Sequence, residues 1–431
     1  MGTNLSSPTP RFAFFAALFV GAATLIFQAS RLWMADTHVG SGKVDEMQQG
    51  AALVPQNADA WDRIGRYYLL SFSDPDIPQA ISDFQRAVKI DPFSEDYWLD
   101  LASAYDASGN TLAAQDAYDH AREVYPASAL VAWNYGNFLL REEKDTEGYA
   151  EIQRAVASNP ELLPLAMSRV WHGTADVNQL LDHVVPPNVD SYVQALNFLA
   201  GIHQMQAGLA VWTRLVELKQ PIRLDVVFPF LQELVRQDDA DDARRMWNEA
   251  VLASGETQLS ASDDSRISDG MFEGTFPNGG LGWNWQPTPG ATIDFDSSTP
   301  SGKGRSVRLD FSGGVNPTLT QPSQYAAVEP GRTYHFHAAM RTQDITTDSG
   351  LRFELHDPNH NSPDIQTDNF TGTHPWTNID VDLPVGSETH FLLVRMFRAP
   401  SRFFDNKLGG TVWITDLSLV PANSAVGQPH Q

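Results

Sequence analysis

The sequence predicts two folded parts behind an N-terminal transmembrane helix: an α-solenoid, followed by a β-sandwich of the jelly-roll type. Three observations support this order. Residues 12–30 contain no charged side chain, residues 57–160 repeat with a step of 34, and period-2 alternation replaces helical periodicity beyond residues 254–267. A step of 34 residues indicates stacked helix hairpins, and short alternating segments separated by turn residues indicate strands.

The apolar run at 12–30 follows a short tail, residues 1–11, and is close to the length of about 20 residues that crosses a bilayer. A cleaved signal peptide is the competing interpretation. Cleavage needs small residues at fixed places, yet the available cuts would put Phe27 or Trp33 there. We therefore expect an uncleaved signal anchor, followed by a stalk at 31–56.

The solenoid prediction depends on two sets of residues that recur with the 34-residue step: Pro92, Pro126 and Pro160, and Ala87, Ala121 and Ala155. Proline ends a helix, and alanine allows two helices to approach closely. Over residues 57–160 this pattern resembles the tetratricopeptide (TPR) repeat family. The resemblance implies stacked helix hairpins with a concave groove that binds a protein partner.

Residues 161–253 keep a weaker form of the same pattern. Ala243, Trp247 and Ala250 repeat the small–aromatic–small spacing, and Trp212 lies 35 residues before Trp247. We interpret this segment as degenerate TPR-like helical repeats that cap the solenoid. An unrelated helical extension is the alternative.

Composition excludes several classes of function. The formal net charge of −24 opposes a phosphate backbone, so we expect no nucleic-acid partner. A basic peptide or a cationic protein surface is compatible with this charge. The chain has no cysteine, which excludes disulfides, thiolate metal sites and a cysteine nucleophile.

After a linker at 254–267, the segment 268–421 reads as a single β-domain, followed by a tail at 422–431. Five short segments alternate with period 2: 306–311, 333–340, 351–355, 391–397 and 412–419. Strands of this length without an intervening helical run are typical of a β-sandwich or jelly roll.

Several motifs in this segment resemble the calcium-bearing jelly-roll carbohydrate-binding modules of families 4, 9 and 22. They are Asp269-Gly-Met-Phe-Glu273, Gly282-Trp283, Pro330-Gly-Arg-Thr-Tyr334 and Thr415-Asp-Leu-Ser-Leu419. The resemblance implies one structural calcium ion between the first and last strands, with Glu273 and Asp416 at the ligand positions. Carboxylate oxygens suit this hard cation. The alternative is that both are solvated carboxylates at strand ends.

Sugar binding requires exposed aromatic rings beside amides or carboxylates. The candidates are Trp285 and the loop residues Phe403, Phe404 and Asn406. Trp283 and Trp376 match positions that pack in the core of this fold, so we expect structural roles for them. A β-domain that has lost glycan binding and contacts only protein is the alternative.

No nucleophile elbow, phosphate-binding loop, zinc-protease motif or dinucleotide fingerprint occurs in the sequence. A solenoid and a module of this size leave no domain of the usual catalytic size, so we expect no enzyme. The sequence predicts a single-pass, membrane-anchored adaptor at the cell envelope, with the bulk of the chain outside the cytoplasm. It would bind protein and a polysaccharide, in polysaccharide synthesis or export. The alternatives are a cytoplasm-facing, protein-only scaffold and a glycan-modifying enzyme.

Overall fold

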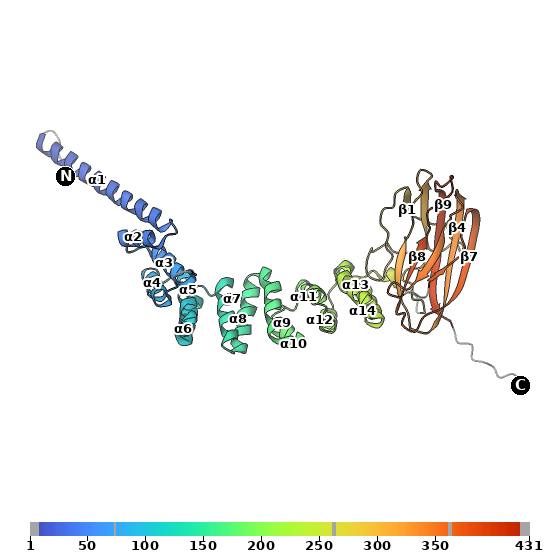
Figure 1. The fold of residues 1–431 in the computed structure, drawn as a ribbon, viewed down its shortest axis with the longest axis horizontal. Coiled ribbons are helices and arrows are strands. Elements are labelled where there is room, and N and C mark those ends of the chain that lie inside the picture. The colour runs from blue at the N-terminus through green and yellow to red at the C-terminus, as the bar shows by residue number, and fades with distance from the viewer. Residues whose placement is uncertain (1–7, 73–74, 261–263, 361–363, 423–431) are drawn as a thin grey trace. The chain divides into compact units, whose positions relative to one another are not determined.

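The computed structural model describes residues 8–72, 75–260, 264–360 and 364–422, and the chain divides into two compact units (Figure 1). The first unit runs to Gly173 and includes Asp182–Val184. The second comprises Thr174–Leu181 and the chain from Val185 onward. This division differs from the expected boundary at 254–267, and the physical reason lies in the packing of the last helix, described below.

The chain begins with one long apolar helix, α1 (Pro8–Val39), in which Phe12–Val39 is long and apolar enough to cross a membrane. The helix therefore extends beyond the predicted span into the predicted stalk. A second helix, α2 (Val44–Leu53), packs on its end: Met47 and Ala51 share a buried cluster with Val39. Residues 31–53 are therefore mostly helical, because the apolar residues beyond position 30 have helices to pack against.

Three helix hairpins follow, as the 34-residue step predicts: α3 (Ala58–Leu70) with α4 (Ile77–Ile90), α5 (Glu95–Ala107) with α6 (Thr111–Val124), and α7 (Ala129–Arg141) with α8 (Asp145–Ser158). Side chains of Asn57, Asn110 and Ser128 each cap a helix by accepting a backbone N–H. Ala87, Ala121 and Ala155 are all fully buried.

Two tryptophans show that the first hairpin carries extra residues. Trp61 Nε1 donates to Pro55 O at 3.0 Å, and Trp98 Nε1 donates to Pro92 O at 2.9 Å. These equivalent bonds lie 37 residues apart rather than 34. Part of the intervening turn, residues 73–74, lies outside the described residues.

Helices continue to residue 254, as predicted. They are α9 (Leu163–Thr174), α10 (Val177–His183), α11 (Val189–Gly201), α12 (Met205–Glu217), α13 (Phe228–Arg236) and α14 (Ala240–Ser254), with short 3₁₀ turns at Pro160–Leu162, Leu224–Val227 and Thr257–Leu259. Trp212 on α12 and Trp247 on α14 are both buried. The pairs α11–α12 and α13–α14 pack against each other within the second unit.

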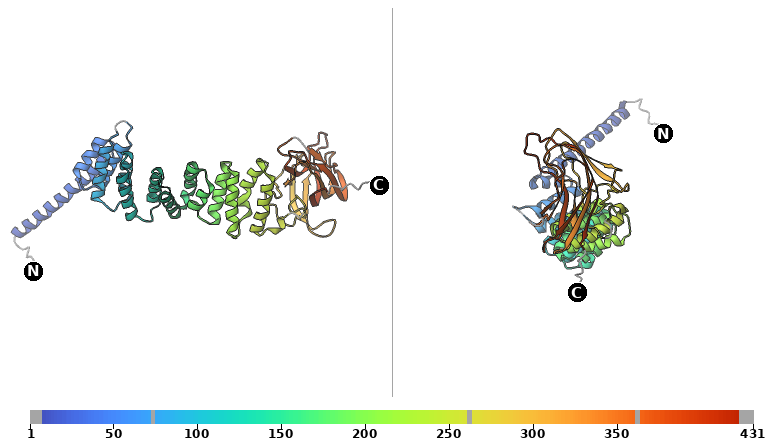
Figure 2. Two further views of the ribbon diagram at one scale, coloured as in Figure 1. Left: turned by 90° about the horizontal axis from the view of Figure 1, so that it is seen from below. Right: turned by 90° about the vertical axis from the view of Figure 1, so that its right-hand side faces the viewer.

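The C-terminal residues form two antiparallel sheets (Figures 1 and 2). The strands are β1 (Ala291–Asp296), β2 (Ser306–Ser312), β3 (Ser323–Ala327), β4 (Thr333–Ile345), β5 (Arg352–His356), β6 (Asp364–Gln366), β7 (Gly372–Pro384), β8 (Phe391–Phe397) and β9 (Gly409–Pro421). One sheet has the order β1-β2-β9-β4-β7 and the other β3-β8-β5-β6.

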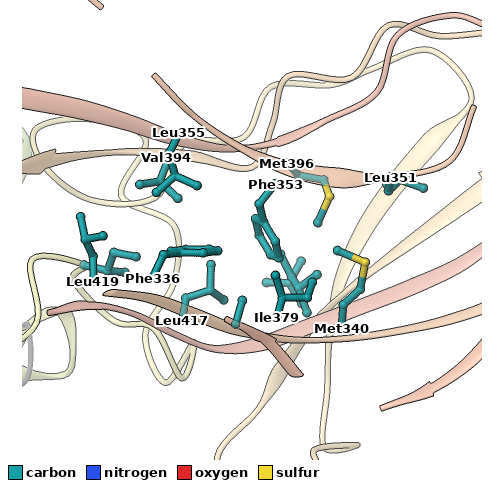
Figure 3. Close-up of a cluster of buried hydrophobic side chains, with 14 of the residues drawn as sticks. Phe336, Met340, Leu351, Phe353, Leu355, Ile379, Val394, Met396, Leu417 and Leu419 are labelled. Atoms are coloured by element: carbon teal, nitrogen blue, oxygen red, sulfur yellow. The ribbon is translucent and has the colours of Figure 1, made fainter. Parts of the chain in front are cut away.

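The two sheets share one hydrophobic core. Phe336, Met340 and Leu419 belong to the five-stranded sheet, and Phe353 and Met396 belong to the four-stranded sheet. Figure 3 shows these side chains between the ribbons of the two sheets. The alternation that predicted the strands therefore has a single cause, which is one buried face on each sheet.

The last helix is built into this β-domain. Trp247 on α14 donates from Nε1 to Ser268 Oγ at 3.1 Å. A Cβ built on Gly280 would lie 2.5 Å from the ring of Trp247, so only glycine fits there. Arg266 N also donates to Leu419 O at 2.7 Å. The described part of 254–267 therefore connects two elements that pack together, and it does not separate two independent domains.

Candidate functional site

The first helices of the three hairpins form a continuous face, because α3 contacts α5 and α5 contacts α7. We call the surface formed by α3, α5 and α7 the inner face. Its exposed or partly exposed polar side chains include Asp59, Arg66, Asp100, Asn134 and Arg141. In a solenoid this is the surface along which an extended partner binds.

Three charged residues of the inner face form a cluster. Arg66 Nε on α3 lies 2.9 Å from Asp62 Oδ2 on the same helix and 2.5 Å from Asp100 Oδ2 on α5. Asp62 is only 2% exposed, whereas the side chain of Asp100 is 25% exposed. Burial and the neighbouring Asp100 carboxylate together raise the pKa of Asp62 to about 8.

At the next hairpin junction, between α5 and α7, positive and negative charges are equal in number. The Arg141 guanidinium on α7 pairs with Asp106 on α5, and each of these two groups has one partner of opposite charge among the described residues. Arg63 pairs with Asp59 at 2.8 Å in the same one-to-one way. The cluster around Arg66 is therefore the part of the inner face where two carboxylates share one cation.

A second site lies in the second unit, where α13 meets the edge of the four-stranded sheet. A pocket of about 320 Å³ is lined by Phe228, Gln232, Asn278, Gly279, Gly280, Asn284, Gln286, Gln321, Ser323, Tyr325 and Leu393. We call it the amide pocket. Five of its lining side chains are amides and none is charged, although charged residues make up 19% of the chain. Such a lining suits a neutral ligand with many hydroxyl groups.

Hydrogen bonds and one close packing contact join the segments that line the amide pocket. Asn278 Oδ1 accepts the N–H of Trp285 at 2.7 Å, and the N–H of Asn284 donates to Ser323 O at 2.8 Å. A Cβ on Gly279 would lie 2.1 Å from the ring of Phe228. The segment before β1 is thus joined both to α13 and to β3.

The predicted sugar residues lie elsewhere and in three different environments. Trp285 is half-buried and packs against the core of the two sheets. Phe403 and Phe404, on the loop between β8 and β9, are 67% and 104% exposed, and Asn406 on the same loop is half-buried. Trp283 is buried, stacked on Phe276, as a structural residue would be. None of the four predicted residues lines the amide pocket.

The predicted calcium ligands lie at the junction of the first turn with the last strand. Glu273 is exposed, while the nearby Asp269 is buried and accepts the N–H groups of Glu273 and Gly274 at 2.6 and 2.9 Å. The Arg305 guanidinium donates to the carbonyls of Phe272, Glu273 and Gly274 at 2.8, 2.6 and 2.6 Å. A side-chain cation thus already binds the backbone oxygens of this turn.

Asp416 belongs to a different cluster. Its carboxylate lies 3.7 Å from His337 Nε2, and the Nδ1 of His337 lies 2.7 Å from Asp380. His335 bridges Asp380 and Asp382 in the same row of the five-stranded sheet, and its hydrogen bond with Asp382 raises its pKa. Within the described ranges, no group of three or more His, Asp or Glu side chains has the geometry of a metal site.

Neither the cluster around Arg66 nor the amide pocket was predicted from the sequence. The cluster around Arg66 had no signal in the 34-residue step, because equivalent positions of the first two hairpins lie 37 residues apart. The amide pocket had no local signal, because its lining comes from α13, from the turn before β1 and from two strands.

We compared the chain with known proteins. No protein-family model matches it, and no curated protein matches it. Solved structures that resemble its fold include MamA (13% identity, TM-score 0.27, 40% of this chain and 85% of that one), PilF of Pseudomonas aeruginosa (18%, 0.27, 47% and 96%) and YrrB, described as a TPR protein with an unusual peptide-binding site (12%, 0.26, 50% and 95%).

These TM-scores are too low to carry an argument. The assignment of the helical part rests on the chain itself. Equivalent helices recur with the 34-residue step, alanines at the predicted positions are fully buried, and first helices contact first helices along one face. This part of the chain is therefore a stack of helix hairpins with the step and packing that are typical of TPR repeats.

Proposed function

We propose that this protein is a non-enzymatic, membrane-anchored adaptor of the cell envelope that binds a protein partner along the inner face. The observation that carries the proposal is the continuous face formed by α3, α5 and α7. Stacked hairpins expose such a face without enclosing a reaction site. The apolar helix Phe12–Val39, whose side chains have no protein partner over most of its length, supports the membrane anchor.

Site-specific photo-crosslinking tests the inner face. A photoreactive residue replaces Asn134 on α7, which is on the inner face, or Leu112 on α6, which is 79% exposed and belongs to a second helix. We expect a discrete crosslinked protein from position 134 and none from position 112. Equal crosslinking from both positions would contradict a groove-directed adaptor.

A reporter enzyme fused after Gln431 tests the location. We propose that the bulk of the chain lies outside the cytoplasm, so a reporter that is active only there should be active in this fusion. Activity of a cytoplasm-specific reporter at the same position would instead support the cytoplasm-facing scaffold.

We further propose that the β-domain is a jelly-roll sandwich that binds a polysaccharide. The amide pocket supports a neutral, hydroxyl-rich ligand, because amides both donate and accept hydrogen bonds and the rings of Phe228 and Tyr325 offer apolar faces. Trp285, Phe403, Phe404 and Asn406 remain the second proposed sugar site. Without retention on a glycan array, the protein-only scaffold is the better account.

Two variants of the intact chain separate the two sugar sites on such an array. Gln232→Ala changes only the amide pocket, and Phe403→Ala with Phe404→Ala changes only the exposed loop. The variant that loses retention identifies the site. Release of sugar from any retained glycan would support the glycan-modifying enzyme instead.

Calcium binding by Glu273 and Asp416 also remains a proposal, supported by the resemblance described above. A bound ion would stabilise the folded state by about 2.7 kcal/mol at a hundredfold excess over its dissociation constant. A chelator should therefore lower the unfolding temperature of the second unit, and Asp416→Ala should abolish that response. Identical unfolding with calcium and with chelator would reduce both residues to surface carboxylates.

A further inference from the structure

The cluster around Arg66 is short of positive charge. Asp62 and Asp100 both lie within salt-bridge distance of Arg66, and Asp96, one turn before Asp100 on α5, forms no salt bridge within the described part of the chain. Arg63, the other cation of this part of α3, is paired with Asp59. Two carboxylates therefore share one guanidinium, and Asp96 has no cation within salt-bridge distance among the described residues.

The two oxygens of the Asp62 carboxylate differ in their partners, since Oδ2 pairs with Arg66 and Oδ1 receives no N–H or hydroxyl donor. Asp62 Oδ1 is buried and accepts no hydrogen bond from any described residue. A buried carboxylate without its full set of partners is destabilising unless it takes up a proton or gains a cation. Burial and the neighbouring Asp100 carboxylate raise the pKa of Asp62 to about 8, so Asp62 holds a proton near neutral pH until a further cation approaches.

The chemistry of the cluster favours an organic cation over a metal ion as its additional partner. Arg66 already lies between the two carboxylates, and no described trio of acidic or histidine side chains has metal-site geometry. An ammonium or guanidinium group binds carboxylates through hydrogen bonds, which are longer than the bonds of a metal ion to its oxygen ligands, and it tolerates a neighbouring arginine. Leu70, one turn after Arg66 on α3, is 73% exposed and offers apolar surface for the stem of a long side chain.

We propose that Asp62, Asp96 and Asp100 form the site where a lysine or arginine side chain of a basic protein segment binds to the inner face. The proposal rests on the proposed function, because it specifies the partner of that same face. The bound cation contacts Asp100 and Asp96, which are accessible, and Asp62 behind them becomes ionised. The negative charge of the whole chain, −24, favours the same partner.

Fluorescence anisotropy with the full chain in a neutral detergent tests the proposal. The probes are labelled twelve-residue peptides of alternating serine with lysine, with arginine or with glutamate. We expect the lysine and arginine peptides to bind and the glutamate peptide not to bind. Asp62→Asn with Asp100→Asn should weaken binding of the basic peptides about tenfold or more, since each lost ion pair of 1.4 kcal/mol is a factor of ten.

The matched control is Asp116→Asn with Asp145→Asn. It makes the same two substitutions at exposed positions on α6 and α8, which do not belong to the inner face, and it removes at least as much negative charge from the free protein. The control should keep most of the affinity. Equal losses in both double variants would show a long-range charge effect and overturn the proposal, as would failure of the basic peptides to bind.

The photo-crosslinking experiment separates this proposal from the proposed function. A crosslinked partner at position 134, together with no preference for basic peptides, would overturn the cation site and leave the adaptor standing. If there is neither a crosslinked partner nor a preference for basic peptides, the cation site and the adaptor function are both overturned.

Discussion

Replacing Gly208 by alanine tests the packing of the helices that precede the β-domain. Gly208 lies near the start of α12, and a Cβ built on it would lie 2.1 Å from Cε2 and 2.5 Å from Cζ of Phe230. Ordinary carbon contacts are about 3.5–4.0 Å, so the ring would have to move by about 1.5 Å. Phe230 on α13 is fully buried, so its ring can move only by displacing its neighbours in the core.

The expected change in stability has two parts of opposite sign. Overpacking of a full core costs about 1–3 kcal/mol, and the overlap here is severe enough for the upper end. Alanine gains about 1 kcal/mol over glycine in a helix. We therefore expect Gly208→Ala to destabilise the second unit by about 2 kcal/mol.

Hydrogen exchange followed by mass spectrometry assigns this change to α12 and α13. A loss of about 2 kcal/mol should speed exchange there by about 30-fold, if exchange proceeds through opening of the unit. The control is Gly201→Ala on α11, where an added Cβ meets no atom within 4 Å. That variant should exchange as slowly as the natural protein, or more slowly.

A double-mutant cycle then identifies Phe230 as the cause. Phe230→Leu alone should destabilise by removing buried ring atoms, but it should partly rescue Gly208→Ala because the overlap disappears. Unchanged exchange in Gly208→Ala, or additive effects in the double variant, would refute the packing argument.

Four further variants follow from the same kind of reasoning, each judged by the unfolding midpoint of the intact chain. Ala121→Leu overpacks a fully buried position and should cost about 1–3 kcal/mol; an unchanged midpoint would mean a wrong repeat register. Trp247→Ala should cost about 3–5 kcal/mol and speed exchange in the first turn of the β-domain as well as in α14. Asp62 binds its proton more tightly in the folded state, so stability should fall as the pH rises from about 4 to about 8, and Asp62→Asn should flatten this slope. Arg305→Met should lower the midpoint by leaving three carbonyls without a donor, whereas Arg305→Lys should restore part of it.

The sequence predicted those parts of the structure that depend on local periodicity. The positions of Ala87, Ala121 and Ala155 are buried because each hairpin repeats the same packing, and one sequence step determines all three. Alternation predicted β2, β4, β5, β8 and β9 for the same reason, whereas β1, β3, β6 and β7 were not predicted. The segment predicted as a stalk is mostly helical in the structure. Its helix α2 was not predicted, because the buried residues Met47 and Ala51 were too few to show a helical period within a polar stretch.

Contacts between distant segments could not be predicted in this way. Trp247 fits the repeat spacing, yet part of its environment comes from Gly280 and Ser268 in the β-domain. No pattern within α14 reports those neighbours. Helices α11–α14 and the β segments therefore looked like separate domains, although they belong to one compact unit.

The junction of the first turn with the last strand shows why residue matching alone does not define a site. The two segments do meet, since Leu417 N donates to Gly270 O at 3.0 Å. The positive φ of 57° at Asp416, within an irregular register against β4, places its carboxylate beside His337. Arg305 meanwhile holds the turn carbonyls through three hydrogen bonds. Any calcium ion at this junction would have to share or replace those bonds, so the response of Arg305→Met to calcium reports directly on which cation joins the two segments.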